Sequence, residues 1–205
     1  IEIEQANADR TGMAVGMAAG LLALRWTIHR GFRLPRQISP ETPADFGLPG
    51  ERVGVATANG KTLSAWLIPA AGDGPAPAVV LMHGWGADAG SLLPLAPPLH
   101  QAGLTLLLPD ARNHGRSDGD SFSSMPRFAE DIAAALDWLC RRADIDCRRL
   151  ALVGHSVGGA AALLAASRRA EVAAVVSLSA FDHPERVMRG YLGRAHIPYV
   201  PVGWL

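Results

Sequence analysis

The chain has 205 residues, of which 49% are hydrophobic and 19% are charged, so it is long and apolar enough for one folded domain with its own core. Nineteen basic side chains balance nineteen acidic ones. This balance offers no net attraction for nucleic acid or for a strongly charged substrate. Composition therefore excludes a disordered chain, and we expect no nucleic-acid partner.

Residues 11–28 form an almost uncharged stretch rich in Ala, Gly, Leu and Met, which follows a short N-terminal tail at residues 1–10. Arg25 interrupts the stretch, whose length is close to the roughly twenty apolar residues that usually span a bilayer. Basic residues follow it, and Trp26 lies where an interfacial aromatic side chain would lie. We therefore expect a transmembrane or membrane-associated helix in the inner membrane, with the globular part facing the cytoplasm. A soluble helix of a cytoplasmic protein is the alternative.

Residues 29–50 are basic at their start and rich in proline, and they predict a linker. Residues 52–57 and 63–68 resemble the two strands of a hairpin, since Asn59-Gly60 between them is a strong signal for a tight turn. Short apolar runs then alternate with helical sequence, which indicates parallel strands buried on both faces. The expected strands are 78–82, 104–108, 150–153 and 172–178, and the expected helices begin at Pro126 and Val157. The first of these helices should carry Phe128, Ile132, Leu136 and Leu139 on one apolar face.

Cys140 and Cys147 are seven residues apart, a spacing that matches no common metal or redox motif. We expect free thiols in a reducing compartment, with a surface disulfide as the alternative. No other metal or cofactor motif occurs in the sequence, so we expect neither a metal nor a cofactor.

The strongest motif is Gly154-His155-Ser156-Val157-Gly158, which lies between an apolar run and an alanine-rich run. A serine with glycines two residues to either side, between a strand and a helix, is the pattern of a nucleophile elbow. The turn is so tight that the flanking positions favour glycine, and the serine is pushed clear of the backbone at the start of a helix. Ser156 is therefore the candidate nucleophile. The alternative is a serine that only caps the helix.

A second motif, His83-Gly84-Trp85-Gly86, follows the predicted strand at 78–82. Acyl transfer needs backbone N–H donors directed at the oxygen that becomes negatively charged in the tetrahedral intermediate. We expect the amide of Val157, directly after the serine, to be one donor and the amide of Trp85 to be the other. For His83 we expect a structural role, in which its ring holds the loop by hydrogen bonds and does not act as the base.

A third motif, residues 110–117, follows the predicted strand at 104–108. We expect Asp110 and Arg112 to pair across this tight loop and to shape the floor beside the elbow. For His114 a structural role is favoured over a catalytic one, because a lone histidine in a loop is usually structural.

These three motifs, in this order and spacing, resemble the α/β-hydrolase superfamily. The loop at residues 110–117 is similar to that of monoacylglycerol-lipase-like esterases and serine-aminopeptidase-like hydrolases, and the hairpin is similar to that of bacterial membrane-anchored members. The resemblance covers roughly residues 51–182. It implies an α/β fold with a mostly parallel central sheet, an antiparallel N-terminal hairpin and helices on both faces. It also implies a small-molecule acyl substrate such as a carboxylic ester.

The sequence departs from this family after the strand at 172–178. The two further strands that carry the acid and the histidine in the family are not visible, and residues 183–205 resemble the start of a lid segment. Asp182 is a possible acid, with a helix cap as the alternative. His183 and His196 are the only histidines after the elbow, and neither is convincing as the base.

Both ends of the chain look cut, and two functional hypotheses follow. The first is a serine hydrolase that is incomplete as given and inactive alone, because it lacks a base. The second is a noncatalytic α/β-hydrolase-fold protein that binds a partner or acts as a scaffold at a membrane.

Overall fold

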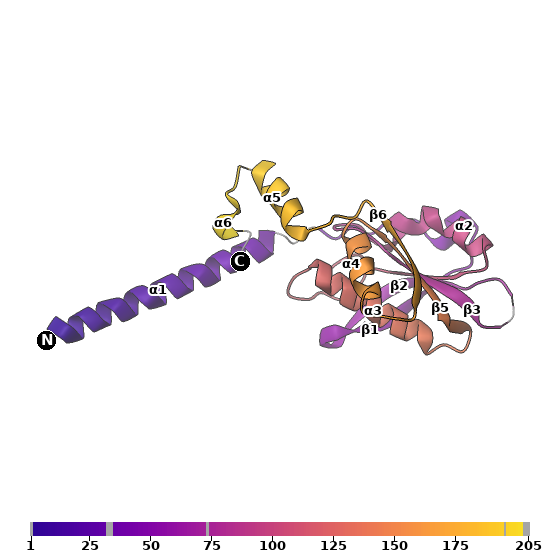
Figure 1. Ribbon diagram of the computed structural model, residues 1–205, viewed down its shortest axis with the longest axis horizontal. Helices are drawn as coiled ribbons and strands as arrows, with labels where there is room; N and C mark the ends of the chain where they lie inside the picture. The colour runs from indigo at the N-terminus through magenta and orange to yellow at the C-terminus, as the bar shows by residue number, and fades with distance from the viewer. Residues whose placement is uncertain (1, 32–34, 73, 195, 203–205) are drawn as a thin grey trace. The chain divides into compact units, whose positions relative to one another are not determined.

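The computed structural model describes residues 2–31, 35–72, 74–194 and 196–202, and its contacts divide the chain into two units. Residues 35–184 form the larger unit, and residues 1–34 and 185–205 belong to the smaller one. Within the described part of the larger unit, six strands form one sheet in the order β1-β2-β4-β3-β5-β6 (Figure 1). The strands are β1 (Glu51–Thr57), β2 (Lys61–Ile68), β3 (Ala76–Met82), β4 (Thr105–Pro109), β5 (Ile145–His155) and β6 (Val172–Leu178).

The predicted hairpin is confirmed, since β1 and β2 pair antiparallel with Val55 opposite Leu63. Asn59 and Gly60 have φ angles of 60° and 64° in the connecting turn η2 (Ala58–Gly60). Two successive left-handed residues match the twist of the two strands. β2 also pairs antiparallel with β4, whereas β4, β3, β5 and β6 are joined by parallel pairing. The predicted mostly parallel sheet is therefore confirmed as well.

Helices cover both faces of the sheet, as expected (Figure 1). α3 (Met125–Cys140) and α4 (Val157–Ala166) pack on one face, and the 3-10 helix η3 (Ala89–Leu95) packs with α2 (Ala96–Gln101) on the other. Along β3, Val80 and Met82 join the core under α3 and α4, whereas Val79 and Leu81 join the core under η3 and α2. A strand that buries both faces requires an unbroken apolar run.

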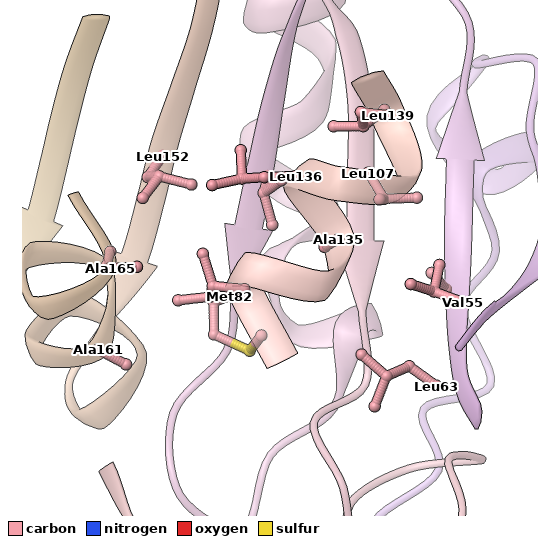
Figure 2. Packing of buried hydrophobic residues seen from close by; sticks show 14 of the residues in the cluster. Val55, Leu63, Met82, Leu107, Ala135, Leu136, Leu139, Leu152, Ala161 and Ala165 are labelled. Carbon is pink, nitrogen blue, oxygen red and sulfur yellow. The ribbon is translucent and has the colours of Figure 1, made fainter. Parts of the chain in front are cut away.

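The core under α3 and α4 is shown in Figure 2. Leu136 and Leu139 of α3 are fully buried in the same cluster as Met82 of β3. α4 contributes small side chains such as Ala161 and Ala165, which allow the helix to approach the sheet closely. The predicted apolar face of α3 is confirmed, because Phe128, Ile132, Leu136 and Leu139 are all buried.

The proline-rich segment at residues 35–50 lies against the larger unit. Pro43 is buried in the short 3-10 helix η1 (Pro43–Phe46), and Leu48 joins the core on the η3 side of the sheet. Arg36 donates a hydrogen bond to the Ser117 carbonyl at 2.5 Å. This part of the expected linker is therefore ordered by contacts with the sheet unit.

The smaller unit contains α1 (Glu2–Gly31), almost all of α5 (Pro184–Arg194) and α6 (Tyr199–Val202). The prediction of a membrane anchor at residues 11–28 is not supported, because no helix in the described residues is both long and apolar enough to cross a bilayer. Residues 32–34 of the expected linker and residues 195 and 203–205 of the expected lid lie outside the described residues.

Cys140 and Cys147 are joined by a disulfide, so the prediction of free thiols is wrong. Cys140 ends α3 and Cys147 lies near the start of β5, and the chain reverses between these two elements. The reversal brings the two Cα atoms to 5.1 Å, which is within the usual range for a disulfide. The sequence spacing did not indicate the pairing, because a change of chain direction creates it and not a local motif.

Candidate active site

Ser156 stands alone between β5, which ends at His155, and α4, which begins at Val157. Its φ of 54° and ψ of −118° lie outside the regions that residues with a side chain usually adopt. The hydroxyl makes no capping hydrogen bond to α4, so the alternative of a capping serine is wrong. A 2.8 Å hydrogen bond from the Ser156 amide to the Leu178 carbonyl, at the end of β6, holds this backbone in place. Strain of this kind is concentrated at functional sites in proteins.

Close packing explains the two glycines that flank the serine. A Cβ at Gly158 would overlap the carbonyl oxygens of Met82 and His83, at the end of β3. A Cβ at Gly154 would overlap the Gly158 carbonyl in the same way. The strands cannot separate to make room, because β3 and β5 are paired with Met82 opposite Gly154. The elbow glycines are therefore required by contact between backbones.

The loop after β3 lies directly beside the elbow. A Cβ added at Gly84 would lie 3.0 Å from Nδ1 of His155 and 3.4 Å from Cβ of Ser156. The loop then makes a tight turn over residues 84–87, in which the Ala87 amide donates a 3.3 Å hydrogen bond to the Gly84 carbonyl. The φ at Gly86, the third residue of this turn, is 76°. A positive φ at the third residue is the pattern of a type II turn, and Trp85 takes the second position of this turn.

The amides of Trp85 and Val157 are both available as donors near Ser156. Within the described residues, neither N–H group donates a hydrogen bond to the protein. Val157 is the first residue of α4, where backbone N–H groups lack an acceptor in the helix and where negative charge is favoured. The contact between Gly84 and Ser156 brings both motifs into one neighbourhood. The structure thus brings Ser156, Val157 and Trp85, the residues that the sequence singles out, into the same region of the fold.

His83 is fully buried and uses both ring nitrogens to hold this loop. Its Nε2 accepts a hydrogen bond from the Ala111 amide at 3.0 Å, so Nδ1 carries the proton and donates to the Gly84 carbonyl at 2.7 Å. Burial lowers the pKa of His83 to about 3, and the nearby His114 adds to the lowering. A neutral ring with both nitrogens engaged cannot act as the base. The predicted structural role of His83 is therefore confirmed.

Two buried carboxylates hold the far end of the same loop. Asp88 accepts hydrogen bonds from the amide and the hydroxyl of Ser39, at 2.5 and 2.6 Å. Asp110 accepts from the amides of Ala89 at 2.7 Å and Arg116 at 2.9 Å, so it ties the loop after β3 to the loop after β4. Burial raises the pKa of Asp110. Sequence reasoning missed Asp88, because nothing near it in the chain indicates a partner 49 residues away.

Arg112 does not pair with Asp110, so that prediction is wrong. The buried guanidinium turns to α3, where Nε donates to Asp131 at 2.8 Å and Nη2 donates to Glu130 at 2.6 Å. Asp110 instead faces Arg52 at 3.6 Å. The side chain of Asp131 is only 1% exposed, so its charge requires a buried cation, and Arg112 supplies it. This ion pair fixes the loop after β4 on the first turns of α3.

His114 also has a structural place, in agreement with the prediction. Its Nδ1 lies 3.0 Å from the Arg112 carbonyl, and its ring meets the rings of Trp85 and Phe128. Burial lowers the pKa of His114, so its ring is favoured in the neutral form. Sequence reasoning placed Phe128 only in the core of the domain and did not connect it with the site.

The Ser156 hydroxyl has no hydrogen-bond partner among the described residues. Asp182 lies in the loop after β6, and the pairing of His155 with Leu178 places the ends of β5 and β6 side by side. Asp182 is therefore on the edge of the sheet that carries Ser156, and its role as the acid stays a prediction. His196 belongs to the smaller unit.

Residues 77–194, more than half of the chain, match the family of the alpha/beta hydrolase fold. An uncharacterised protein of Mycobacterium tuberculosis is 33% identical over 187 residues, which cover 91% of this chain and 64% of that protein. A polyketide transferase of Penicillium is 32% identical over 146 residues, which cover 68% of this chain and 49% of the transferase. The chain thus spans between about half and two thirds of the length of these curated relatives.

Solved structures share the fold. An esterase of Pyrococcus furiosus superposes with a TM-score of 0.71 at 23% identity, over 84% of this chain and 65% of the esterase. An α/β hydrolase from Penicillium superposes with a TM-score of 0.61 at 28% identity, over 72% of this chain and 53% of that chain.

Proposed function

Because this chain belongs to the α/β-hydrolase fold family, we propose that it carries the nucleophile and the oxyanion site of a serine hydrolase for carboxylic esters or related acyl substrates. One observation carries the proposal. The strained, uncapped Ser156 lies beside a loop and a helix start whose amides, at Trp85 and Val157, have no acceptor among the described residues. A nucleophile next to two unused donors is the arrangement that acyl transfer needs.

In the proposed reaction, Oγ of Ser156 attacks the carbonyl carbon of the substrate, and its proton passes to a general base. The π electrons of the carbonyl move to its oxygen, and the Trp85 and Val157 amides stabilise this negative charge by hydrogen bonds. The C=O bond then re-forms, the bond to the leaving group breaks, and an alcohol or thiol departs with a proton. Water attacks the acyl-enzyme in the same way and releases a carboxylic acid, which restores the hydroxyl.

The proton acceptor is the part of this reaction that the described residues do not supply, since no imidazole hydrogen-bonds Oγ of Ser156 among them. His83 is unsuitable because its ring is neutral and both nitrogens are engaged. We propose Asp182 as the acid that orients the base, on the ground of its place after β6. The chain spans only 64% of the Mycobacterium relative, so the activity of the whole protein is part of the proposal.

Thioesters belong among the substrates to test. A thiohydrolase of Arthrinium phaeospermum is 34% identical to this chain over 131 residues, which cover 62% of this chain and 42% of that protein. The fold alone does not select between oxygen and sulfur leaving groups. Matched aryl ester and aryl thioester substrates with the same acyl chain will compare the two classes directly.

The first experiment is covalent labelling of the purified full-length protein with a fluorophosphonate, because the described residues do not supply the base that activates Ser156. Mass spectrometry should find the phosphonyl group on Ser156, and Ser156→Ala should abolish the labelling. Labelling should also fall when the protein is unfolded in urea, because the elbow exists only in the folded state. A folded full-length protein that is not labelled at Ser156 would exclude the proposed function and favour a binding protein without catalysis.

A second experiment tests the oxyanion donor at Trp85. Proline is favoured at the second position of a type II turn, so Trp85→Pro removes the amide N–H while keeping the turn. Trp85→Ala removes the same side chain and keeps the N–H, which makes it the matched control. We expect Trp85→Pro to label at least about tenfold more slowly than Trp85→Ala, since losing one oxyanion donor typically costs about a hundredfold or more. Equal rates would refute the donor role.

A further inference from the structure

Four aromatic rings gather at the loop that carries Trp85, and Phe128 is in contact with the other three. The rings of Phe128 and Trp85 are 6.3 Å apart, and their planes are nearly parallel at 14°. His83 and His114 meet the same phenyl ring edge to face, at 5.7 and 5.1 Å. These separations are in the range in which aromatic rings attract each other. Phe128 is therefore the centre of a cluster that joins the loop after β3, the loop after β4 and α3.

Phe128 is firmly held at the start of α3. The residue is 1% exposed, and its amide donates to the Ser124 carbonyl at 3.0 Å. The next residues of α3 are fastened to the loop after β4 by the pair between Asp131 and Arg112. A ring with so little freedom can position a neighbour that is only partly buried, as Trp85 is.

The turn that contains Trp85 is held weakly by its own backbone. Its closing hydrogen bond is long, at 3.3 Å, and the Trp85 amide has no acceptor among the described residues. The indole adds two ring contacts, because it lies nearly parallel to Phe128 and meets His114 edge to face at 5.9 Å between ring centroids. Since ring and amide belong to one residue, holding the indole limits how far the peptide can rotate.

We propose that Phe128 is a positioning residue, which with His114 holds the Trp85 indole and so directs the Trp85 amide to the oxyanion. The inference rests on the proposed function, because the direction of this amide matters only if an oxyanion forms beside Ser156. Phe128 acts through Trp85 and touches no reacting atom. No local sequence pattern indicates this role, because Phe128 has the spacing of an ordinary core residue on α3.

The test is a double-mutant cycle on the rate at which a fluorophosphonate labels Ser156 in the full-length protein. Phe128→Leu keeps an apolar side chain and removes the stacking face, and it should slow labelling about tenfold. In a Trp85→Ala background, where the amide is present without the ring, the same change should slow labelling no further. Leu136→Ala is the matched control, because Leu136 lies on α3 in the same core cluster but has no ring to stack on Trp85. It should lower stability without changing the labelling rate of the folded protein.

Two outcomes of this cycle would overturn the inference. One is an equal effect of Phe128→Leu with and without the Trp85 ring, and the other is equal slowing by Leu136→Ala. Absence of any labelling in the wild type would instead reject the proposed function, and NMR then decides the positioning role by itself. The Trp85 amide cross peak should shift and its order parameter should fall in Phe128→Leu, but not in Leu136→Ala. Phe128→Tyr should restore both readings, and an unchanged cross peak in Phe128→Leu would refute the role.

Discussion

Acidification should destabilise the larger unit through His83. The pKa of His83 is about 3 in the folded protein and about 6.5 in the unfolded chain, because burial opposes the charged form. Between these two values the unfolded state binds a proton that the folded state does not, so the free energy of unfolding falls as the pH falls. The contribution of the neutral His83 ring to the free energy of unfolding is fully present above a pH of about 6.5, and it is lost as the pH falls from about 6.5 to about 3.

The size of the effect follows from the separation of the two pKa values. Each pH unit below about 6.5 lowers the free energy of unfolding by close to 1.4 kcal/mol for one proton. A change from about pH 7 to about pH 5 should therefore lower it by roughly 2 kcal/mol. Urea unfolding at several pH values measures this loss directly. His83→Gln is the reference, because its amide oxygen can accept the hydrogen bond from Ala111 and the side chain does not titrate.

Comparison with the glutamine variant removes the contributions of other groups. Asp110 and Asp131 have raised pKa values in the folded protein, so acidification through those values favours the folded state and acts in the opposite direction. His114, with a lowered pKa, acts in the same direction as His83. The prediction is a steeper loss of stability in the wild type than in His83→Gln. Parallel curves for the two proteins would show that His83 is not held neutral, and would refute its assigned role in the loop.

Three further changes test other contacts. Gly158→Ala should lower the free energy of unfolding by about 2 kcal/mol or more, because the new Cβ meets the carbonyl oxygens of Met82 and His83. A normal urea midpoint would contradict this packing. Arg112→Met should lower the free energy of unfolding by about 3–5 kcal/mol, because it leaves the buried Asp131 charge unpaired. Adding Asp131→Asn should recover part of this loss in urea unfolding. A larger loss in the double variant would show that the pair is not coupled. Reduction of the disulfide between Cys140 and Cys147 should lower the free energy of unfolding by about 2.5 kcal/mol, because the unfolded chain gains the entropy of an open loop. An unchanged melting temperature with reductant would argue against the bond.

The elements that carry the site were predictable because their signals are local. The tight turn at Asn59-Gly60, the apolar run of β3 and the pattern of glycines around Ser156 can each be read within one segment, although the contact that requires Gly158 comes from the end of β3. Backbone sterics and side-chain burial act over such short spans, so the type and the order of the strands and helices could be read from the sequence. The strand and helix around the elbow then made Ser156 the candidate nucleophile.

Contacts between distant segments were not predictable in the same way. The partner of Arg112 is on α3 and not in its own loop, and the partner of Asp88 is Ser39, far before it in the chain. The disulfide likewise depends on how α3 and β5 reverse direction. Predicting each of these pairs requires knowing which surfaces of the fold meet. The charges and spacing within one motif do not contain that information.

The sequence by itself determined the family resemblance and the candidate nucleophile, since the glycines and the serine of the elbow occupy five consecutive residues. Only the tertiary structure decided what surrounds that serine. The parallel pairing of β3 with β5 sets Gly84 against the elbow, and the packing of α3 brings Phe128 to the Trp85 ring. These distances depend on strand register and helix packing over the whole sheet, and a motif of five residues cannot specify them.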